Sequence, residues 1–195
     1  MIGAGWGRTG TTSLAAALDR LGAGPVLQMQ ETWPHPELAE LWVRHLDGER
    51  IDWPAELRGW NATADWPGCW QWQEFAALWP QAPVILSVRD PDEWYESVLA
   101  SIHLWTTPGT DFGPPPVIEL LARLWEVDFG GWDRVAADRA GTIDRFRWHN
   151  QSVRENCPPD RLIEWTVADG WGPIAGALGV PVPDESFPHL NRRPS

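Results

Sequence analysis

A glycine-rich turn, Gly5-Trp-Gly-Arg-Thr-Gly-Thr-Thr12, stands between the first apolar residues of the chain and an amphipathic segment. The residues after this turn repeat apolar side chains at helical spacing, at Leu14, Ala17, Leu18 and Leu21. A glycine turn that enters a helix leaves several backbone N–H groups without intrahelical partners and aligned with the helix dipole. The segment therefore predicts a strand, a tight turn and a helix whose first turn binds an anion such as a phosphate group.

The spacing of the glycines admits more than one kind of anion site. Gly5 and Gly10 have the spacing of the Walker motif, but Thr11 stands where a nucleotide-hydrolysing P-loop requires lysine, and the loop carries Arg8 instead. The same letters satisfy the dinucleotide pattern G-x-G-x-x-G, for which the ribose-binding acid would be Glu31. A third alternative is a turn that only joins a strand to a helix. The dinucleotide match is weak, because Glu31 lies beyond a predicted strand and two glutamines, and the hydroxyl residues that follow Gly10 favour a P-loop-like site over a plain turn.

Segments typical of strands and of helices alternate along the rest of the chain. We expect strands at 26–29, 60–64, 84–88 and 161–167, and helices at 11–21, 36–46, 91–102, 117–125, 134–156 and 172–178. Asp90 is suited to cap the helix that begins at Pro91. This alternation predicts an α/β fold, a three-layer P-loop-like architecture with a central parallel sheet flanked by helices. The Pro/Gly-rich segment 103–131 predicts a helical or irregular insertion that forms a lid.

The composition narrows the class of protein. A chain of 195 residues suits a single domain, here residues 1–195 with the insertion at 103–131. The formal net charge of -12 opposes binding to nucleic acid or to an anionic membrane surface. No apolar run is long enough to cross a bilayer, and the N-terminus has no pattern of an export signal, so we expect a cytoplasmic protein. Cys69 and Cys157 lack metal-ligand spacing, which argues against a zinc site and a disulfide framework.

Two segments together resemble a known family. The run Arg8-Thr-Gly-Thr-Thr-Ser-Leu14 resembles the phosphosulfate-binding loop of the PAPS-dependent sulfotransferases, and Arg89 with Ser97 resembles the arginine and serine that bind the donor's 3′-phosphate. Shorter matches follow in the same order as in that family, and the chain is similar to a bacterial branch of short sulfotransferase-like proteins. These matches are Asp65-Trp-Pro67, Trp94-Tyr-Glu-Ser97, His149-Asn150, Gly170-Trp171 and Phe187-Pro188.

The resemblance implies a donor, 3′-phosphoadenosine 5′-phosphosulfate (PAPS), and a reaction that moves its sulfuryl group to a hydroxyl or an amine of a small molecule. It implies donor-binding roles for the following residues: Gly7, Arg8, Thr9, Gly10, Thr11, Thr12, Ser13, Arg89 and Ser97. Most relatives have lysine where this chain has Arg8. Because arginine stays protonated, we assign Arg8 electrostatic stabilisation of the reaction. Sulfuryl carries less charge than phosphoryl, so we expect no metal.

The candidate base is Asp65, which occupies the place where many sulfotransferases carry histidine before an apolar residue and proline. A carboxylate beside Trp66 and Trp70 is expected to have a raised pKa and to accept the proton of an acceptor hydroxyl. The alternative is that Asp65 caps the helix after Pro67. His103 and His149 are further candidates for the base.

Alternatives remain for the other site residues and for the function. Arg89 has an alternative role in an ion pair with an acidic residue at 90–93, and Ser97 has one as a solvent-facing helix residue. A P-loop kinase of a small molecule, or a noncatalytic nucleotide-binding domain, would share the same turn. The acidic charge and the abundance of tryptophan favour a neutral, cationic or aromatic acceptor, bound near 66–72 and 103–131. Arg192 and Arg193 are candidates to reach the 3′-phosphate.

Overall fold

The computed structural model describes residues 1–190, and these fall into two compact units. The first unit comprises Met1–Gln28, Leu57–Arg89 and the chain from Asn150 onward. The second comprises Met29–Glu56 and Asp90–His149. The insertion predicted at 103–131 is thus one part of a larger helical unit, and its role as a lid stays a prediction. Arg192 and Arg193 lie outside the described residues.

The first unit contains a parallel sheet with β1 at its centre. The structure pairs β1 with β4 and β4 with β5, and separately β2 with β3, always in parallel. Thr63 of β3 donates its N–H to the carbonyl of Met1 at 3.1 Å, and its Oγ1 accepts from the N–H of Gly3 at 3.1 Å, so β3 lies beside β1. The spatial order is therefore β2-β3-β1-β4-β5. The strand bounds are β1 Ile2–Gly3, β2 Val26–Leu27, β3 Ala62–Thr63, β4 Val84–Ser87 and β5 Leu162–Trp165.

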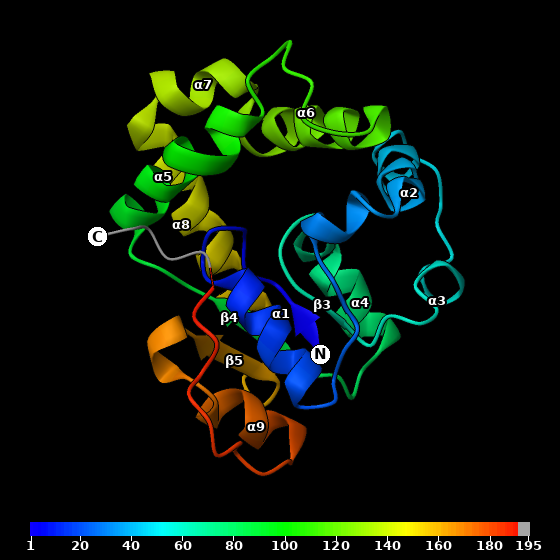
Figure 1. The fold of residues 1–195 in the computed structure, drawn as a ribbon, viewed down its shortest axis with the longest axis vertical. Helices are drawn as coiled ribbons and strands as arrows, with labels where there is room; N and C mark the ends of the chain where they lie inside the picture. Colours follow the sequence, from blue (N-terminus) through cyan, green and yellow to red (C-terminus); the bar gives the residue numbers. More distant parts are fainter. Residues whose placement is uncertain (191–195) are drawn as a thin grey trace. The chain divides into compact units, whose positions relative to one another are not determined.

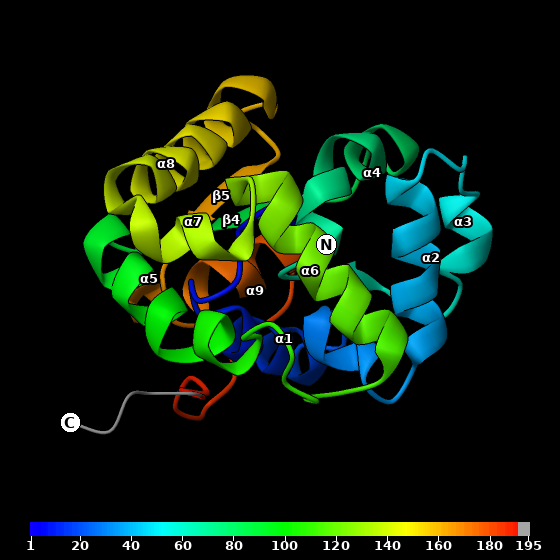
Figure 2. The same ribbon diagram turned by 90° about the horizontal axis from the view of Figure 1, so that it is seen from above.

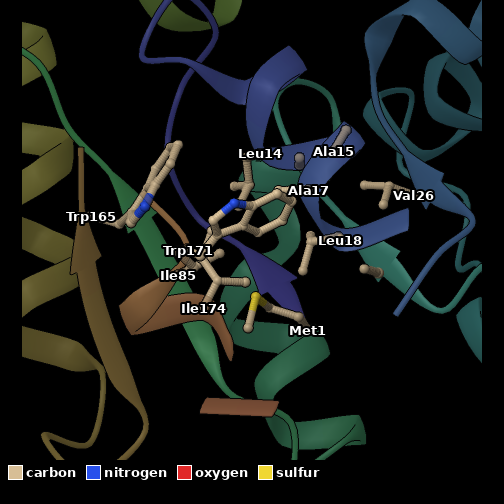
Figure 3. Packing of buried hydrophobic residues seen from close by; sticks show 12 residues of the cluster. Met1, Leu14, Ala15, Ala17, Leu18, Val26, Ile85, Trp165, Trp171 and Ile174 are labelled. Carbon is tan, nitrogen blue, oxygen red and sulfur yellow. The ribbon is translucent and has the colours of Figure 1, made fainter. Parts of the chain in front are cut away.

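Helices cover both faces of this sheet, as Figure 2 shows. Helices α1 (Thr11–Arg20) and α9 (Gly172–Leu178) lie on one side, and α4 (Trp72–Leu78) with the last turns of α8 (Arg139–Asn156) lies on the other. The buried face of α1 packs on Ile85, Trp165 and Trp171 (Figure 3). The sheet and its two helical layers confirm the predicted three-layer α/β fold.

Three strand ends meet at one edge of the sheet. Because β1, β3 and β4 are parallel neighbours, the residues that follow them emerge on the same side. The segment after β1 is the glycine-rich turn, the segment after β3 begins with Ala64 and Asp65, and the segment after β4 contains Val88 and Arg89. The fold therefore brings together three segments that contain predicted site residues.

The second unit consists of helices (Figure 1). Helix α2 lies beside α6, and Arg123 of α6 pairs with Asp47 at the end of α2 at 2.6 Å. The predicted helix at 36–46 is confirmed as α2, and the predicted stretch at 117–125 extends to a longer α6 that begins with two prolines in its first turn. The helix bounds are α2 Pro36–Leu46, α3 Trp53–Glu56, α5 Pro91–Val98, α6 Pro115–Phe129 and α7 Trp132–Ala137, with shorter turns η1 Met29–Thr32 and η3 Leu99–His103.

The single helix predicted at 134–156 is wrong, because the chain forms α7 and α8 with Asp138 between them. Asp138 has non-helical dihedral angles, φ -126° and ψ 76°, and its carboxylate accepts the N–H of Gly141 at 2.9 Å. An aspartate that caps the next helix in this way ends the helix before it. The short side chain therefore breaks a pattern that is otherwise continuously helical.

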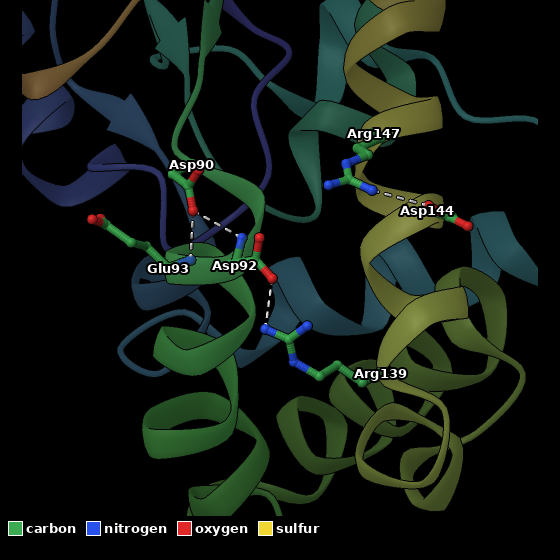
Figure 4. A network of polar contacts seen from close by, with 6 residues as sticks. All are labelled: Asp90, Asp92, Glu93, Arg139, Asp144 and Arg147. Atoms are coloured by element: carbon green, nitrogen blue, oxygen red, sulfur yellow. Dashed lines mark hydrogen bonds and ion pairs between the residues drawn. The ribbon is translucent and has the colours of Figure 1, made fainter.

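Charged side chains tie the start of α5 to the start of α8 (Figure 4). Asp90 accepts the N–H groups of Asp92 and Glu93 at 3.0 Å each, which confirms the predicted cap. Arg139 donates to Asp92 at 2.6 Å. The carboxylates of Asp90 and Asp92 thus have partners within their own unit.

Candidate functional site

The glycine-rich turn takes the backbone conformation expected of an anion-binding loop. It leaves β1 at Gly3 and enters α1 at Thr11, and Gly10 has φ 96°, in the left-handed region that favours glycine. Arg8 has φ 69° and is one of two described residues other than glycine with positive φ, Asp65 being the second with φ 68°. Non-glycine residues in this region are strained by about 1–3 kcal/mol, and they concentrate at functional sites.

Asp65 faces the loop from the end of β3. Its Oδ2 accepts a hydrogen bond from the Thr11 hydroxyl at 3.3 Å, and its Oδ1 accepts from the N–H of Trp66 at 2.6 Å. The short turn η2 (Gly68–Gln71) begins after Pro67 without a side-chain cap, so the alternative role of Asp65 as a helix cap is wrong. Gly7 lies close against the same carboxyl, because a Cβ placed on it would lie 2.6 Å from Oδ1 of Asp65 and 2.5 Å from the ring of Trp66.

Burial raises the pKa of Asp65 to about 6. The two hydrogen bonds and the positive charge of Arg8 oppose this rise, because each favours the ionised carboxylate. The carboxyl is therefore mostly ionised at neutral pH, and its pKa lies within the range in which a carboxylate is an effective proton acceptor.

Asp65→Asn is expected to stabilise the folded protein at neutral pH. The pKa of the folded state is about 6 against an ordinary value of 3.8, so the folded protein binds the proton more tightly than the unfolded chain does. The stability that comes from the protonated Asp65 is fully present below about pH 4 and is lost as the pH rises through about 6. Above that pH, the buried carboxylate lowers the free energy of unfolding by up to about 3 kcal/mol. Urea unfolding at about pH 5 and about pH 8 should show the larger gain at the higher pH. Equal gains in the free energy of unfolding at the two pH values would contradict the raised pKa of Asp65.

Thr9 ties the loop to strand β4. Its Oγ1 donates to the carbonyl of Trp6 at 2.6 Å and lies 2.6 Å from Oγ of Ser87. Thr9 is 2% exposed and Ser87 is 1% exposed. The Thr9 side chain therefore holds the loop in place, and the contribution of Thr9 to donor binding stays a prediction. Sequence reasoning missed Ser87, although a single hydroxyl within the apolar run of β4 was a signal.

The hydroxyls of the first turn of α1 have different surroundings. Thr11 is buried and bonded to Asp65, Thr12 is half-buried, and Ser13 is buried. The Oγ of Ser13 accepts the N–H of Leu190 at 2.9 Å, which attaches the end of the described chain to α1. The Ser13 hydroxyl thus has a structural contact, and its role in donor binding stays a prediction.

Arg89 lies beside the loop, whereas Ser97 belongs to the other unit. The Nη1 of Arg89 donates to the carbonyl of Arg8 at 3.4 Å, so the two arginines of the predicted donor site meet. Ser97 lies on α5, where it is 3% exposed, so its alternative as a solvent-facing residue is wrong. Its role at the 3′-phosphate stays a prediction.

The two histidines are buried in the helical unit. His103 stacks on Trp132 with ring centroids 4.1 Å apart, and its Nε2 lies 3.0 Å from the carbonyl of Trp132. That nitrogen donates to the carbonyl, which leaves Nδ1 as the proton-accepting nitrogen of a neutral ring. His149 is 8% exposed. Asp65 is bonded to Thr11 at the end of the loop, and the roles of His103 and His149 as bases stay predictions.

Two further features of residues 1–190 concern membrane-spanning helices and metal ligands. Over this range no helix combines the length and apolar character needed to cross a membrane. Over the same range no three His, Cys, Asp or Glu side chains are grouped so that they would hold a metal ion.

Comparison with known proteins agrees with the geometry. Ava biosynthesis cluster protein M of Aspergillus versicolor is 31% identical to this chain over 205 aligned residues, which cover 94% of this chain and 77% of the fungal protein. A family model described as the sulfotransferase domain matches residues 1–195. The chain, with its P-loop-like sheet and glycine-rich turn, belongs to the sulfotransferase domain family.

Proposed function

We propose that this protein transfers a sulfuryl group from PAPS to a hydroxyl or an amine of a small-molecule acceptor. The observation that carries the proposal is the contact between the anion-binding loop and a carboxyl of raised pKa, through Thr11 and Asp65 at 3.3 Å. A group-transfer enzyme needs an anion site for its donor and a proton acceptor next to it. This site supplies both from adjacent strand ends.

The loop would hold the phosphosulfate end of the donor. Its backbone N–H groups and the N-terminus of α1 favour negative charge, and the guanidinium of Arg8 adds a fixed positive charge. In the transfer, the bond between sulfur and the bridging oxygen breaks and negative charge builds on that oxygen. Arg8 would stabilise this charge without giving up its proton. The product of this half of the reaction is adenosine 3′,5′-bisphosphate.

Asp65 would receive the proton of the acceptor. As the acceptor oxygen or nitrogen forms its bond with sulfur, its proton passes to the carboxylate. The reaction as proposed involves protein groups and the donor, without a metal. The proton then returns to solvent when the sulfated product leaves.

The net charge of the chain and the name of its fungal relative both support a small-molecule acceptor. The net charge of -12 disfavours polyanionic acceptors such as sulfated polysaccharides. The fungal relative is named for a biosynthesis cluster, which supports a small-molecule acceptor, neutral, cationic or aromatic. We also propose that the protein acts in the cytoplasm as a single domain.

Calorimetric titration with adenosine 3′,5′-bisphosphate tests the donor assignment. We expect micromolar binding to the wild type and a loss of about 10–100-fold in both Arg8→Ala and Arg89→Ala, because each removes a charged hydrogen-bond donor from the phosphates. Arg20→Ala is the matched control. Arg20 lies at the far end of α1 in an exposed ion pair with Glu185 at 3.0 Å, so its loss should leave the affinity unchanged.

A parallel titration with ATP and Mg²⁺ separates the alternatives. Tighter binding of ATP than of the bisphosphate would point to a kinase and would refute the sulfuryl donor. Binding of the bisphosphate without turnover of PAPS in a broad screen of phenols, alcohols and amines would point to a noncatalytic nucleotide-binding domain.

A further inference from the structure

Ser87, the last residue of β4, contacts the anion-binding loop at two points. Its Oγ lies 2.6 Å from Oγ1 of Thr9. Because the single hydroxyl hydrogen of Thr9 is donated to the carbonyl of Trp6, the Ser87 hydroxyl must be the donor to Thr9. The loop residue Gly5 lies on the other side, where an added Cβ would be 2.1 Å from Oγ of Ser87. Ser87 is therefore bonded to the outgoing limb of the loop and lies against the incoming limb.

The same strand end leads to Arg89. Two residues after Ser87, the guanidinium of Arg89 donates to the carbonyl of Arg8 at 3.4 Å. Arg8 is thus bonded to Arg89, and the next loop residue, Thr9, is bonded to Ser87. Both partners belong to the end of β4 and the segment that follows it. The Ser87 bond is the buried one, with both partners at most 2% exposed, so water does not compete for it.

We propose that Ser87 is a positioning residue that sets the spacing between the loop around Arg8 and the guanidinium of Arg89. Through this spacing it determines the preference for a nucleotide with phosphates at both its 5′ and 3′ positions. The proposal rests on the proposed donor. A ligand with two phosphates on one ribose gains from both groups only if the two protein sites are held at the matching distance. A ligand with the 5′-phosphate alone uses the loop alone and gains nothing from that spacing.

The test compares two ligands on a double-mutant cycle. Dissociation constants for adenosine 3′,5′-bisphosphate and for adenosine 5′-monophosphate are measured on the wild type, Ser87→Ala, Thr9→Val and the double variant. We expect each single variant to weaken the bisphosphate about tenfold and the monophosphate less than about twofold. The double variant should be no weaker than Thr9→Val, because Ser87→Ala removes only the bond to Thr9, which Thr9→Val has already removed together with the bond to the Trp6 carbonyl.

Thr9→Ser keeps the hydroxyl and should retain the preference for the bisphosphate to within about twofold. Thr9→Val, which removes the same bond from the other side, carries the test if a thermal melt shows that Ser87→Ala does not fold. Equal weakening of both ligands, or a preference that survives both Ser87→Ala and Thr9→Val, would overturn the role of Ser87. A wild type with no preference for the bisphosphate would instead refute the proposed donor, and the proposal with it.

Discussion

Asp65→Asn is expected to lower kcat for sulfuryl transfer by about 10²–10⁴-fold while changing the affinity for adenosine 3′,5′-bisphosphate only a few-fold. Asparagine keeps the shape of the side chain and an Oδ1 that accepts the N–H of Trp66, and its Nδ2 can donate to the Thr11 hydroxyl, which in the wild type donates to Oδ2 of Asp65. It removes the basic carboxylate. The loop should therefore still bind the donor product, and the loss should fall on the transfer step.

The pH profile identifies the group responsible. With the carboxylate as the base and its pKa at about 6, kcat/KM of the wild type should rise with pH through that value and then level off. The charges and donors that face this carboxyl are Arg8, Thr11 and the N–H of Trp66, and all three favour the ionised form. The measurement uses the first acceptor found among simple phenols, alcohols and amines. Residual activity of Asp65→Asn that keeps the same rise would show that another group is the base.

The local parts of this site could be predicted because neighbouring residues determine them. The glycine spacing of 5–10, followed by a helical repeat, defines the turn and the start of α1. The cap at Asp90 and the whole of α2 depend on sequence neighbours in the same way, and the structure confirms both. The order of elements gave the parallel three-layer fold, since strands that alternate with helices have few other ways to bury their apolar faces.

The direction of each hydroxyl could not be predicted from the sequence. Thr9 and Thr11 are two residues apart in the same motif, yet one bonds to Ser87 and the other to Asp65. These partners lie 78 and 54 residues away, so their positions depend on the assembled sheet. The same reason applies to Ser13, whose partner Leu190 is 177 residues away. A motif therefore identifies the loop, and tertiary contacts decide which of its side chains are available to a ligand.

The choice between base and cap at Asp65 shows the same limit. An aspartate before Trp-Pro is compatible with both roles in sequence. The structure gives this residue φ 68°, and its carboxyl is bonded to α1 and to the N–H of Trp66, not to the turn that follows. That contact depends on β3 lying beside β1, which the sequence of either segment alone does not specify.

Arg8→Ala is expected to lower kcat by about 10²–10³-fold, in addition to weakening the binding of the donor product. The guanidinium is the fixed positive charge of the loop, and its effect should be largest when charge builds on the leaving oxygen. Arg8 also holds the pKa of Asp65 down. The acid limb of the pH profile should therefore move to higher pH in Arg8→Ala, which a loss of folding would not produce.

Substitution by lysine and by glycine separates charge from backbone conformation at this position. Arg8→Lys keeps the charge and should retain more of kcat than Arg8→Ala, although a single ammonium cannot make two parallel bonds to a phosphate. Arg8→Gly removes the charge but suits φ 69°, so it should raise the free energy of unfolding by about 1 kcal/mol while losing as much kcat as Arg8→Ala. A stable, inactive glycine variant would mean that the chain holds Arg8 in a strained conformation for the sake of catalysis. A glycine variant that keeps its activity would show that the loop amides alone stabilise the leaving group.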